Sequence, residues 1–370
     1  MNEKYTSLGL MSGTSGDGVD ASILITNGIN QYEVIKDKYF EYDADIYKDI
    51  HKLKEKIHKI GHLKTFSKEI NDLERRITIF HAEIIKDLKT RDDTIIGLHG
   101  QTIYHNPSEK ISKQLGNGKL LNQLTRRNIV FNFRNNDILN DGEGAPLTPI
   151  FHQIISKQKK INLPICFLNI GGISNVTIIT GNNLHEIKSK DIGPGNCLID
   201  NWVRNNSDKK FDKDGNFAIS GTKNEIIFEQ AQELYKNRVK KKKSFDTSDF
   251  DISFVRGLNL EDGATTLTDF TASIIGEELF LFLKKFNNHL QNILLCGGGR
   301  KNQVLIKKIK EHLPSKINLK VIDDYQIDGD FVESQAFAFL AVRSILRLPI
   351  SFPNTTGCKK PCVGGEIIRN

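Results

Sequence analysis

The chain has 370 residues, of which 38% are hydrophobic, and its 52 basic and 45 acidic residues give a formal net charge of +7. This length and hydrophobic content suit about two folded domains and exclude disordered and fibrous proteins. The sequence has no run of 18 apolar residues, and its first residues lack the apolar stretch of a signal peptide. We therefore expect a soluble, cytoplasmic protein that does not bind membranes.

Five cysteines are present, an odd number, and no export signal accompanies them. Reduced thiols are the expected state. Cys358 and Cys362 are close enough in sequence to suggest a metal site, but no second pair of Cys or His follows at the spacing of zinc sites. We accordingly do not expect a structural zinc ion.

A basic run at residues 238–243 invites comparison with nucleic-acid-binding proteins. The chain has no RNA-binding signature and no pattern of aromatic residues suited to base stacking. A solvent-exposed loop is the better interpretation of this run, and nucleic acid is not an expected partner.

The first half of the chain opens with strands and continues with helices. Three adjacent antiparallel strands are expected first, with a glycine-rich turn between the first two. The predicted strands of this half cover residues 6–11, 21–26, 32–40, 94–99 and 129–133. Apolar residues at helical spacing predict helices over residues 46–60 and 66–88.

The second half repeats this order, because a helix through Phe151 leads into another hairpin with a Gly-Gly turn. Its predicted strands cover residues 165–170, 176–179 and 293–296, and its later helices cover residues 224–235, 266–286, 302–313 and 331–348. The tail from residue 349 is expected to be loop. The repeated order predicts two related α/β domains with the functional site in the cleft between them.

Residues 11–20 read Met-Ser-Gly-Thr-Ser-Gly-Asp-Gly-Val-Asp and join the first two predicted strands. Backbone N–H groups of such a turn can surround phosphate oxygens. The turn is not a Walker loop, because the Gly-Lys-Ser/Thr ending is missing and no helix follows directly. An ordinary hairpin turn is the alternative, and the density of glycine and hydroxyl residues favours phosphate binding.

Three further glycine-rich turns follow apolar segments, at residues 169–175, 191–196 and 296–302. Glycine lets a backbone approach a ligand closely. Each turn alone could be a packing device. Together with residues 11–20 they predict a nucleotide held by turns from both domains, a design unlike the single Gly-x-Gly-x-x-Gly loop of dinucleotide-binding folds.

Three polar residues outside these turns could also carry chemistry. His99 ends a predicted strand and is either a ligand-binding or a structural histidine. Arg134 follows another strand, where its guanidinium could bind a carboxylate or a phosphate. Glu333 begins a helix with an apolar face and could equally be solvated.

At these motifs the chain resembles the anhydro-N-acetylmuramic acid kinase family over nearly its whole length. The resemblance rests on Gly-Leu-Met-Ser-Gly-Thr-Ser from residue 9, His-Gly-Gln-Thr from 99, Gly-Ala-Pro-Leu from 144, Asn-Ile-Gly-Gly-Ile from 169, Asp-x-Gly-Pro-Gly-Asn from 191, Cys-Gly-Gly-Gly from 296 and Gly364-Gly365. It implies a two-lobed actin-like/sugar-kinase α/β fold with two related RNase H-like domains and ATP between them. The first lobe is expected to comprise residues 1–140 and 349–370, with the phosphate loop and substrate residues, and the second residues 141–348.

The resemblance also implies a role for individual residues. Asp191 matches the general base, and the nucleotide-binding turns match Gly171, Gly172, Gly297, Gly298 and Gly299. The ATP phosphate loop matches Gly13, Thr14, Ser15, Gly16, Asp17, Gly18, Val19 and Asp20. Substrate-side positions match His99, Gln101, Arg134 and Glu333. Asp17 or Asp20 is expected to hold Mg²⁺, through water.

The chain departs from the family's usual residues at several of these motifs. The family usually has Leu at Gly16 and Asp at Asn132, Arg near Asn135 and Asn136, Thr at Ile192 and Ala at Ser334. Gly16 should make the phosphate loop more flexible. Asn132, with basic residues also missing beside it, should change the electrostatic setting of Arg134 and could weaken activity.

The activity implied is the opening of the 1,6-anhydro bridge of 1,6-anhydro-N-acetylmuramic acid by water with transfer of the γ-phosphoryl of ATP to O6, in peptidoglycan recycling. Motif spacing alone leaves two alternatives open. One is an ordinary hexose kinase, in which the base deprotonates a sugar hydroxyl. The other is an actin-like ATP switch without kinase activity. A homodimer is compatible with the sequence, which contains no signal for the oligomeric state.

Overall fold

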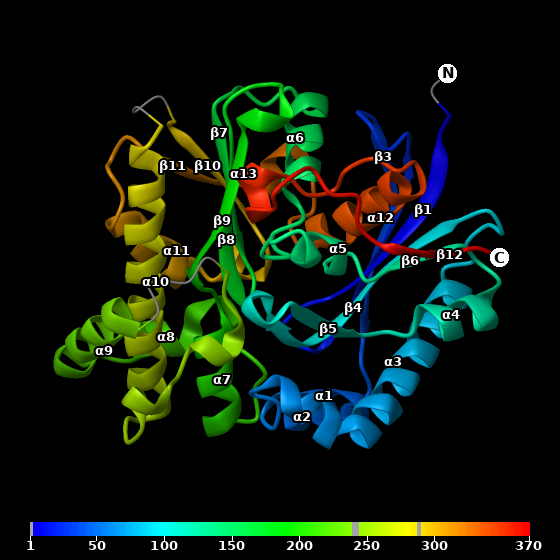
Figure 1. Cartoon of the computed structure of the whole chain (residues 1–370). Helices are drawn as coiled ribbons and strands as arrows, with labels where there is room; N and C mark the ends of the chain where they lie inside the picture. The colour runs from blue at the N-terminus through cyan, green and yellow to red at the C-terminus, as the bar shows by residue number, and fades with distance from the viewer. Residues whose placement is uncertain (1–2, 239–243, 287–289) are drawn as a thin grey trace. The chain divides into compact units, whose positions relative to one another are not determined.

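The computed structural model describes residues 3–238, 244–286 and 290–370, which form two compact units. Unit 1 comprises Met1–Ile161, Asn182–Lys188 and Asp330–Asn370, and unit 2 comprises Asn162–Gly181 and Ser189–Gly329. Each unit is built on one β-sheet with helices packed against it (Figure 1). The basic run at residues 239–243 lies outside the described residues.

The sheet of unit 1 has the strand order β12-β6-β4-β1-β2-β3, and β5 pairs with β4. Its strands are β1 (Tyr5–Ser12), β2 (Gly18–Thr26), β3 (Tyr32–Glu41), β4 (Ile95–Asn106), β5 (Ile111–Leu115), β6 (Ile129–Phe131) and β12 (Glu366–Ile368). β2 is antiparallel to β1 and β3, whereas β4 is parallel to β1 and β6. The three antiparallel strands predicted at the N-terminus are therefore confirmed.

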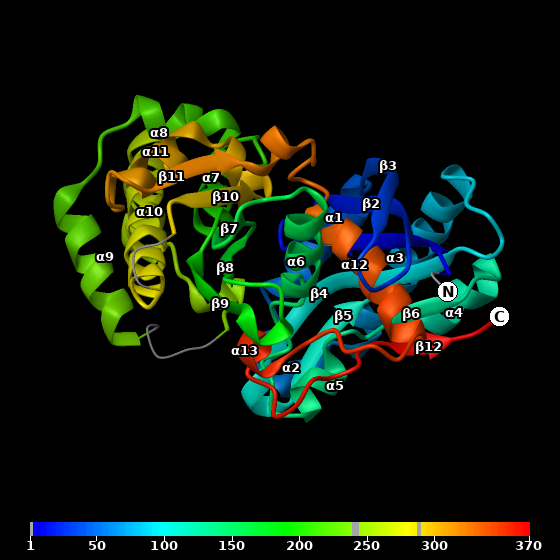
Figure 2. The same ribbon diagram turned by 90° about the horizontal axis from the view of Figure 1, so that it is seen from above.

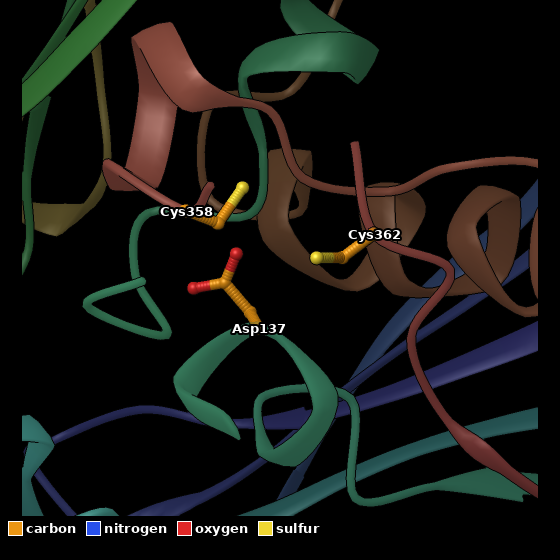
Figure 3. A group of neighbouring side chains, drawn as sticks. All are labelled: Asp137, Cys358 and Cys362. Carbon is orange, nitrogen blue, oxygen red and sulfur yellow. The ribbon is translucent and has the colours of Figure 1, made fainter. Parts of the chain in front are cut away.

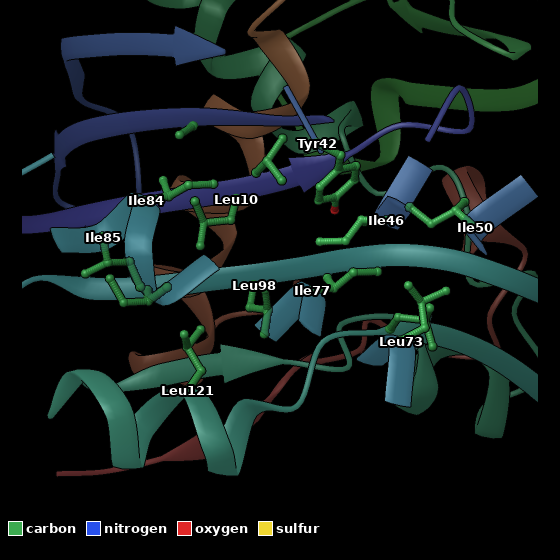
Figure 4. Packing of buried hydrophobic residues seen from close by; sticks show 14 of the residues in the cluster. Leu10, Tyr42, Ile46, Ile50, Leu73, Ile77, Ile84, Ile85, Leu98 and Leu121 are labelled. Carbon is green, nitrogen blue, oxygen red and sulfur yellow. The ribbon is translucent and has the colours of Figure 1, made fainter. Parts of the chain in front are cut away.

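The two faces of this sheet are covered by different helices. The helices of unit 1 are α1 (Ala44–Lys54), α2 (Ile60–Thr65), α3 (Ser67–Asp87), α4 (Gly118–Thr125), α5 (Asn135–Leu139), α6 (Pro149–Gln158), α12 (Val332–Ile345) and α13 (Pro353–Thr356). On one face, Leu10 of β1 and Leu98 of β4 pack with Ile77 of α3 in a buried core (Figure 4). Since successive strand residues point to opposite faces, Gly9 and Gly97 face the other side, where α12 lies.

Helix α12 packs so closely on the sheet that its backbone meets the strands at glycines. A Cβ atom at Gly9 would lie 1.9 Å from the carbonyl oxygen of Ser334, and one at Gly97 would lie 2.4 Å from that of Phe337. This packing assigns residues 330–348 to unit 1, and residues 141–161 also belong there. The division therefore differs from the predicted boundary, which placed both segments in the second lobe, because contacts between distant residues decide it.

The sheet of unit 2 has the strand order β11-β10-β7-β8-β9. Its strands are β7 (Ile165–Ile170), β8 (Ile173–Ile179), β9 (Ile187–Pro194), β10 (Asn292–Cys296) and β11 (Asn318–Val321). β7 is antiparallel to β8 and parallel to β10, which is parallel to β11. The order and these directions repeat those of β3-β2-β1-β4-β6, so the prediction of two related α/β units is confirmed.

The helices of unit 2 are α7 (Cys197–Asn206), α8 (Asn216–Ser220), α9 (Glu225–Arg238), α10 (Leu260–Lys284) and α11 (Gln303–Glu311) (Figure 2). Ile275 of α10 and Leu305 of α11 pack with Leu168 of β7 in a buried core on one face of the second sheet. The long helix α10 is buried from Gly263 to Gly276, because it contributes both to the core against the sheet and to a second core around Trp202. Among the described residues, no helix is both long and apolar enough to span a bilayer.

Several element boundaries differ from the sequence-based expectations. Strands β5, β9, β11 and β12 and helices α4 and α7 were not expected, and the helix predicted over residues 46–60 ends at Lys54, with α2 following as a separate helix. These strands are short or carry charged residues such as Lys113, Lys188 and Lys190, so no apolar run marks them. Pairing makes them strands: β5, β9 and β11 each pair with the strand that precedes them in the chain, and β12 pairs with the distant β6.

His81 of α3 provides a test of the core of unit 1. Its side chain is fully buried, burial lowers its pKa to about 3, and within the described part of the chain neither ring nitrogen has a hydrogen-bond partner. Unfolding restores a pKa of about 6.5, so between these values the unfolded state binds a proton that the native state does not. His81 should therefore lower the stability progressively as the pH falls below about 6.5.

We expect His81→Leu to remove this pH dependence. Relative to the unmodified chain, the variant should be about 2 kcal/mol more stable at pH 5 than it is at pH 7. Urea titrations at the two pH values measure this difference. The exposed His58 supplies a matched control, since His58→Gln should leave the pH dependence of stability unchanged. Parallel curves for His81→Leu and the unmodified chain would contradict the assigned neutral state of His81.

Candidate active site

The glycine-rich segment of unit 1 forms a tight turn between β1 and β2. The N–H of Gly16 donates to the carbonyl of Gly13 over 3.2 Å, and Ser15 Oγ donates to Asp17 Oδ1 over 2.5 Å. The last part of the predicted loop, residues 18–20, belongs to β2. The turn proper is therefore shorter than predicted.

Several side chains hold this turn in place. Gln101 Nε2 donates to the carbonyl of Gly13 over 2.9 Å, and Lys54 Nζ donates to that of Thr14 over 2.7 Å. Gly16 has a φ of +64°, and a Cβ atom there would lie 2.9 Å from Ile50. The conformation of this turn thus favours glycine at position 16. Gln101, expected on the substrate side, is fully buried and supports the turn.

Two carboxylates lie beside the turn. Burial raises the pKa of the Tyr39 hydroxyl, and the negative charges of Asp17, Glu41 and Asp20 raise it further, which places these groups near one another. Mg²⁺ commonly uses one or two carboxylates together with substrate phosphates. Asp17 and Asp20 therefore fit such an ion, although neither belongs to a cluster of three metal-ligating side chains within the described residues.

His99 and Arg134 form a hydrogen-bonded pair in unit 1. His99 lies inside β4, is 5% exposed, and its Nδ1 lies 2.8 Å from the carbonyl oxygen of Gly100. Its Nε2 lies 2.8 Å from Arg134 Nη2 and 3.2 Å from Arg134 Nε. Burial, and then the charge of Arg134, hold the pKa of His99 well below 6.5. His99 is therefore neutral, with Nδ1–H donating to Gly100 and Nε2 accepting from Arg134.

The other side of the Arg134 guanidinium is fixed by the loop that follows α5. Arg134 Nη1 donates to the carbonyl of Gly144 over 2.8 Å, and the N–H of Gly144 donates to Asp137 Oδ2 over 2.7 Å. Arg134 is half-buried, and its orientation is set from two directions. This preorganisation suits the binding of an anionic or polyhydroxyl ligand.

The departure at Asn132 has a structural reason. Asn132 Nδ2 donates to Glu366 Oε1 over 2.8 Å. An aspartate at this position would place its carboxylate beside that of Glu366 in β12. An amide, which can donate to Glu366, therefore suits this chain. Asn136 is likewise engaged, donating to the carbonyl of Val363 over 2.5 Å. Ser334 stands where the family usually has Ala, and its hydroxyl lies 2.6 Å from the Ser22 hydroxyl.

Glu333 lies in the first turn of α12 and is half-buried. Phe337, one turn further along the same side of the helix, packs its ring 4.5 Å from that of His99. The fold of unit 1 therefore brings α12 with Glu333 close to β4 with His99. The structure thus gathers three of the expected substrate-side residues in one unit.

In unit 2, Asp191 lies in β9, where the sequence suggested a turn. Its side chain is 9% exposed, and its Oδ2 accepts a hydrogen bond from the N–H of Phe245 over 3.0 Å. A carboxylate oriented in this way is suited to accept a proton from a bound molecule. Phe245 contributes through its backbone, so nothing in its side chain marks this role in the sequence.

The three glycine-rich turns of unit 2 converge at the ends of β7 and β10. The N–H of Gly195 donates to the carbonyl of Gly172, and that of Asn196 to the carbonyl of Gly171, each over 2.8 Å. Cβ atoms at Gly297 and Gly299 would lie 2.5 Å from Asn169 Oδ1 and 2.3 Å from Ile170. No atom would lie within 4 Å of a Cβ at Gly298 among the described residues. These turns therefore lie together at one end of the sheet of unit 2.

Two asparagines at this edge were not singled out from the sequence. Asn169, the penultimate residue of β7, lies directly opposite Asn175 of β8, and Asn175 Oδ1 is buried without a hydrogen-bond partner in the described part of the chain. The repeated Asn around Ile-Gly-Gly-Ile-Ser is the signal that could have identified them. Both are candidates for polar contacts with a ligand at these turns.

Comparisons with known proteins agree with this arrangement of motifs. The profile of the family described as anhydro-N-acetylmuramic acid kinase matches residues 5–370. The chain is 53% identical to the anhydro-N-acetylmuramic acid kinase of Pelagibacter ubique (strain HTCC1062) and 35% identical to that of Agrobacterium fabrum (strain C58 / ATCC 33970), in each case over the full length of both proteins.

A solved structure with a similar backbone is the activator of the 2-hydroxyisocaproyl-CoA dehydratase from Clostridium difficile with bound ADPNP. The TM-score is 0.45 with 11% identity, covering 92% of this chain and 96% of that one. The family of the chain is established by the full-length sequence matches and does not depend on this structural similarity. The chain belongs to the anhydro-N-acetylmuramic acid kinase family.

Proposed function

We propose that the chain uses ATP and water to convert 1,6-anhydro-N-acetylmuramic acid into N-acetylmuramic acid 6-phosphate, a step of peptidoglycan recycling in the cytoplasm. The full-length family match carries this proposal. In the reaction, water attacks C1, the bond between C1 and O6 breaks, and O6 takes the γ-phosphoryl group while ADP leaves. A homodimer is compatible with this function.

Asp191 is the proposed general base. Its carboxylate would accept the proton of the water that attacks C1, a contribution typically of about 10²–10⁴-fold. The hydrogen bond from the N–H of Phe245 to Oδ2 supports this role, because it holds the carboxylate in one orientation.

The glycine-rich turns are the proposed nucleotide contacts. Backbone N–H groups of residues 13–17 would bind the phosphates, and the turns around Gly171 and Gly298 would bind the rest of ATP. Phosphoryl transfer depends chiefly on positioning and charge neutralisation. Mg²⁺ held by Asp17 or Asp20 would supply part of that neutralisation.

Arg134, His99 and Glu333 are the proposed sugar-binding residues of unit 1. The substrate carries a lactyl carboxylate, and a guanidinium is the side chain best suited to bind a carboxylate through two hydrogen bonds. Neutral His99 supports this assignment, since its Nε2 orients Arg134 without adding a competing positive charge.

Turnover in ¹⁸O-water tests the proposed reaction. The label should appear on the anomeric carbon of the product and the phosphate ester should stay unlabelled, because O6 keeps its bond to C6. The product must be analysed early, beside unlabelled product incubated in the same water, since anomers exchange this oxygen slowly. Label in phosphate would indicate ATP hydrolysis by a switch, and an intact anhydro ring in a phosphorylated product would indicate a different acceptor hydroxyl.

Arg134→Lys is expected to raise KM for the anhydrosugar by about 10-fold or more with a smaller change in kcat. The planar guanidinium of Arg134 contacts His99 Nε2 and the Gly144 carbonyl and can still bind a carboxylate. A lysine ammonium cannot contact all three groups at once. Steady-state kinetics with varied sugar at saturating ATP measure the effect. Arg91→Lys, at an exposed ion pair with Asp93, is the matched control and should behave like the unmodified enzyme. An unchanged KM in Arg134→Lys would remove Arg134 from substrate binding.

A further inference from the structure

The C-terminal tail of unit 1 brings two cysteines and an aspartate together at a place unrelated to the proposed reaction. The Sγ atoms of Cys358 and Cys362 and a carboxylate oxygen of Asp137 all lie within 4.8 Å of one another. Figure 3 shows the three side chains beside one another, Asp137 from α5 and the cysteines from the tail. All three residues are buried, with exposed fractions of 1–3%.

The backbone around the cysteines is fixed on both sides. Cys362 pairs with Ser351, its N–H donating to the carbonyl of Ser351 over 3.0 Å, and the N–H of Lys359 donates to the carbonyl of Asn140 over 3.0 Å. Both thiols donate to one acceptor, the carbonyl of Lys360, over 3.1 Å each. The two sulfur atoms are therefore held on the same side of the turn at residues 358–362.

The Asp137 carboxylate is held by neutral donors. Ser351 and Thr356 donate their hydroxyl hydrogens to Oδ1 over 2.5 and 2.6 Å, and the N–H of Gly144 donates to Oδ2 over 2.7 Å. Within the described residues, Asp137 forms no ion pair with a Lys, Arg or His side chain. A buried carboxylate without a cationic partner is costly, and a cation bound beside it would provide a direct electrostatic partner.

We propose that Cys358, Cys362 and Asp137 form a binding site for a thiophilic divalent cation, with Zn²⁺ as the ion that suits this donor set. Two sulfur ligands disfavour Mg²⁺ and Ca²⁺, which take oxygen ligands, and the Cys-x₃-Cys spacing lies within the range found in zinc sites. The carbonyl of Lys360 or a water molecule would complete the coordination. The hydroxyls of Ser351 and Thr356 would orient the carboxylate from outside the metal's own ligands.

Zn²⁺ binding would leave the net charge of this site unchanged. As Zn²⁺ binds, both thiols release their protons to solvent, so the three ligands carry −3 and the ion +2, leaving the same net −1 that the Asp137 carboxylate carries alone. The ion would reach the site through the turn itself, where Lys359, Lys360 and Pro361 are exposed. The bound ion would link the tail to α5 and so stabilise unit 1.

Titration of the reduced, full-length protein with Co²⁺ and Zn²⁺ tests the proposal. Co²⁺ should bind with a stoichiometry of about one per chain and produce the near-ultraviolet sulfur-to-cobalt charge-transfer band of a thiolate site, and Zn²⁺ should displace it. Cys358→Ser and Cys362→Ser should each lose the band and bind Zn²⁺ about 100-fold more weakly or worse. Cys197→Ser, at a free cysteine of unit 2, should retain both properties.

The absence of a charge-transfer band in the unmodified protein would overturn the proposal without any variant, so the test does not depend on whether the serine variants fold. A band that survives in Cys358→Ser and Cys362→Ser, or that disappears in Cys197→Ser, would assign the metal to other cysteines and also overturn it. A disulfide between Cys358 and Cys362, with no metal uptake after its reduction, would identify a redox pair in place of a metal site.

Discussion

Asp191→Asn is expected to lower kcat by about 10²-fold or more while leaving ATP binding and the unfolding transition unchanged. The asparagine oxygen can still accept the hydrogen bond from the N–H of Phe245, so the local structure should persist. The amide cannot accept a proton from water, however, and the proposed base is lost. Initial rates of ADP formation that depends on added anhydrosugar measure the effect.

A second carboxylate provides the control for this variant. Asp208 of unit 2 is exposed, so Asp208→Asn should retain full turnover. Nucleotide binding measured by calorimetry should be equal in both variants and in the unmodified enzyme. If the turnover of Asp191→Asn lies within a few fold of normal, Asp191 is not the general base and another group must accept the proton.

Gly9→Ala is expected to lower the free energy of unfolding of the chain by about 3 kcal/mol or more. The added methyl carbon would lie 1.9 Å from the carbonyl oxygen of Ser334 and 2.6 Å from the backbone nitrogen of Ala338. Both atoms belong to the backbone of α12, so the helix itself must move away from β1. Urea denaturation followed by circular dichroism measures the loss of stability.

This displacement should also affect the proposed sugar site. Helix α12 carries Glu333 and packs Phe337 against His99, so Gly9→Ala should raise KM for the anhydrosugar even under conditions in which the variant is folded. Gly61 is the matched control, because no atom of the described chain lies within 4 Å of a Cβ at this helical position. Gly61→Ala should be neutral or stabilising by up to about 1 kcal/mol. Equal stabilities of the two variants would contradict the close packing of α12.

The candidate site was partly visible in the sequence, since its glycine-rich turns depend on local composition. The turn at residues 13–17 and the pair Gly171-Gly172 follow strands whose apolar runs are evident. The pairing of His99 with Arg134 was not visible, because the two residues are 35 positions apart and meet only through the parallel pairing of β4 with β6. The neutral state of His99 also depends on tertiary structure, because burial and the nearby charge of Arg134 lower its pKa.

The carboxylate of Asp137 illustrates the same limit. Cys358 and Cys362 alone lack the second pair that zinc sites usually show in sequence. The third ligand comes from α5, more than 200 residues away, and its approach depends on the backbone bonds that anchor the tail to α5.

By itself, the sequence determined the two repeated hairpins, most of the helices and the glycine-rich turns, because hydrophobic periodicity and turn chemistry depend on neighbouring residues. Only the tertiary structure decided that α12 belongs to unit 1, that Asp191 lies in a strand, and that Asp137 meets the two cysteines. The physical reason is that the first and last of these features depend on packing between distant segments, and the strand around Asp191 depends on the pairing of β9 with β8. Such contacts leave no periodic signal in the chain, and in this protein they are made possible by small residues such as Gly9 and Gly97.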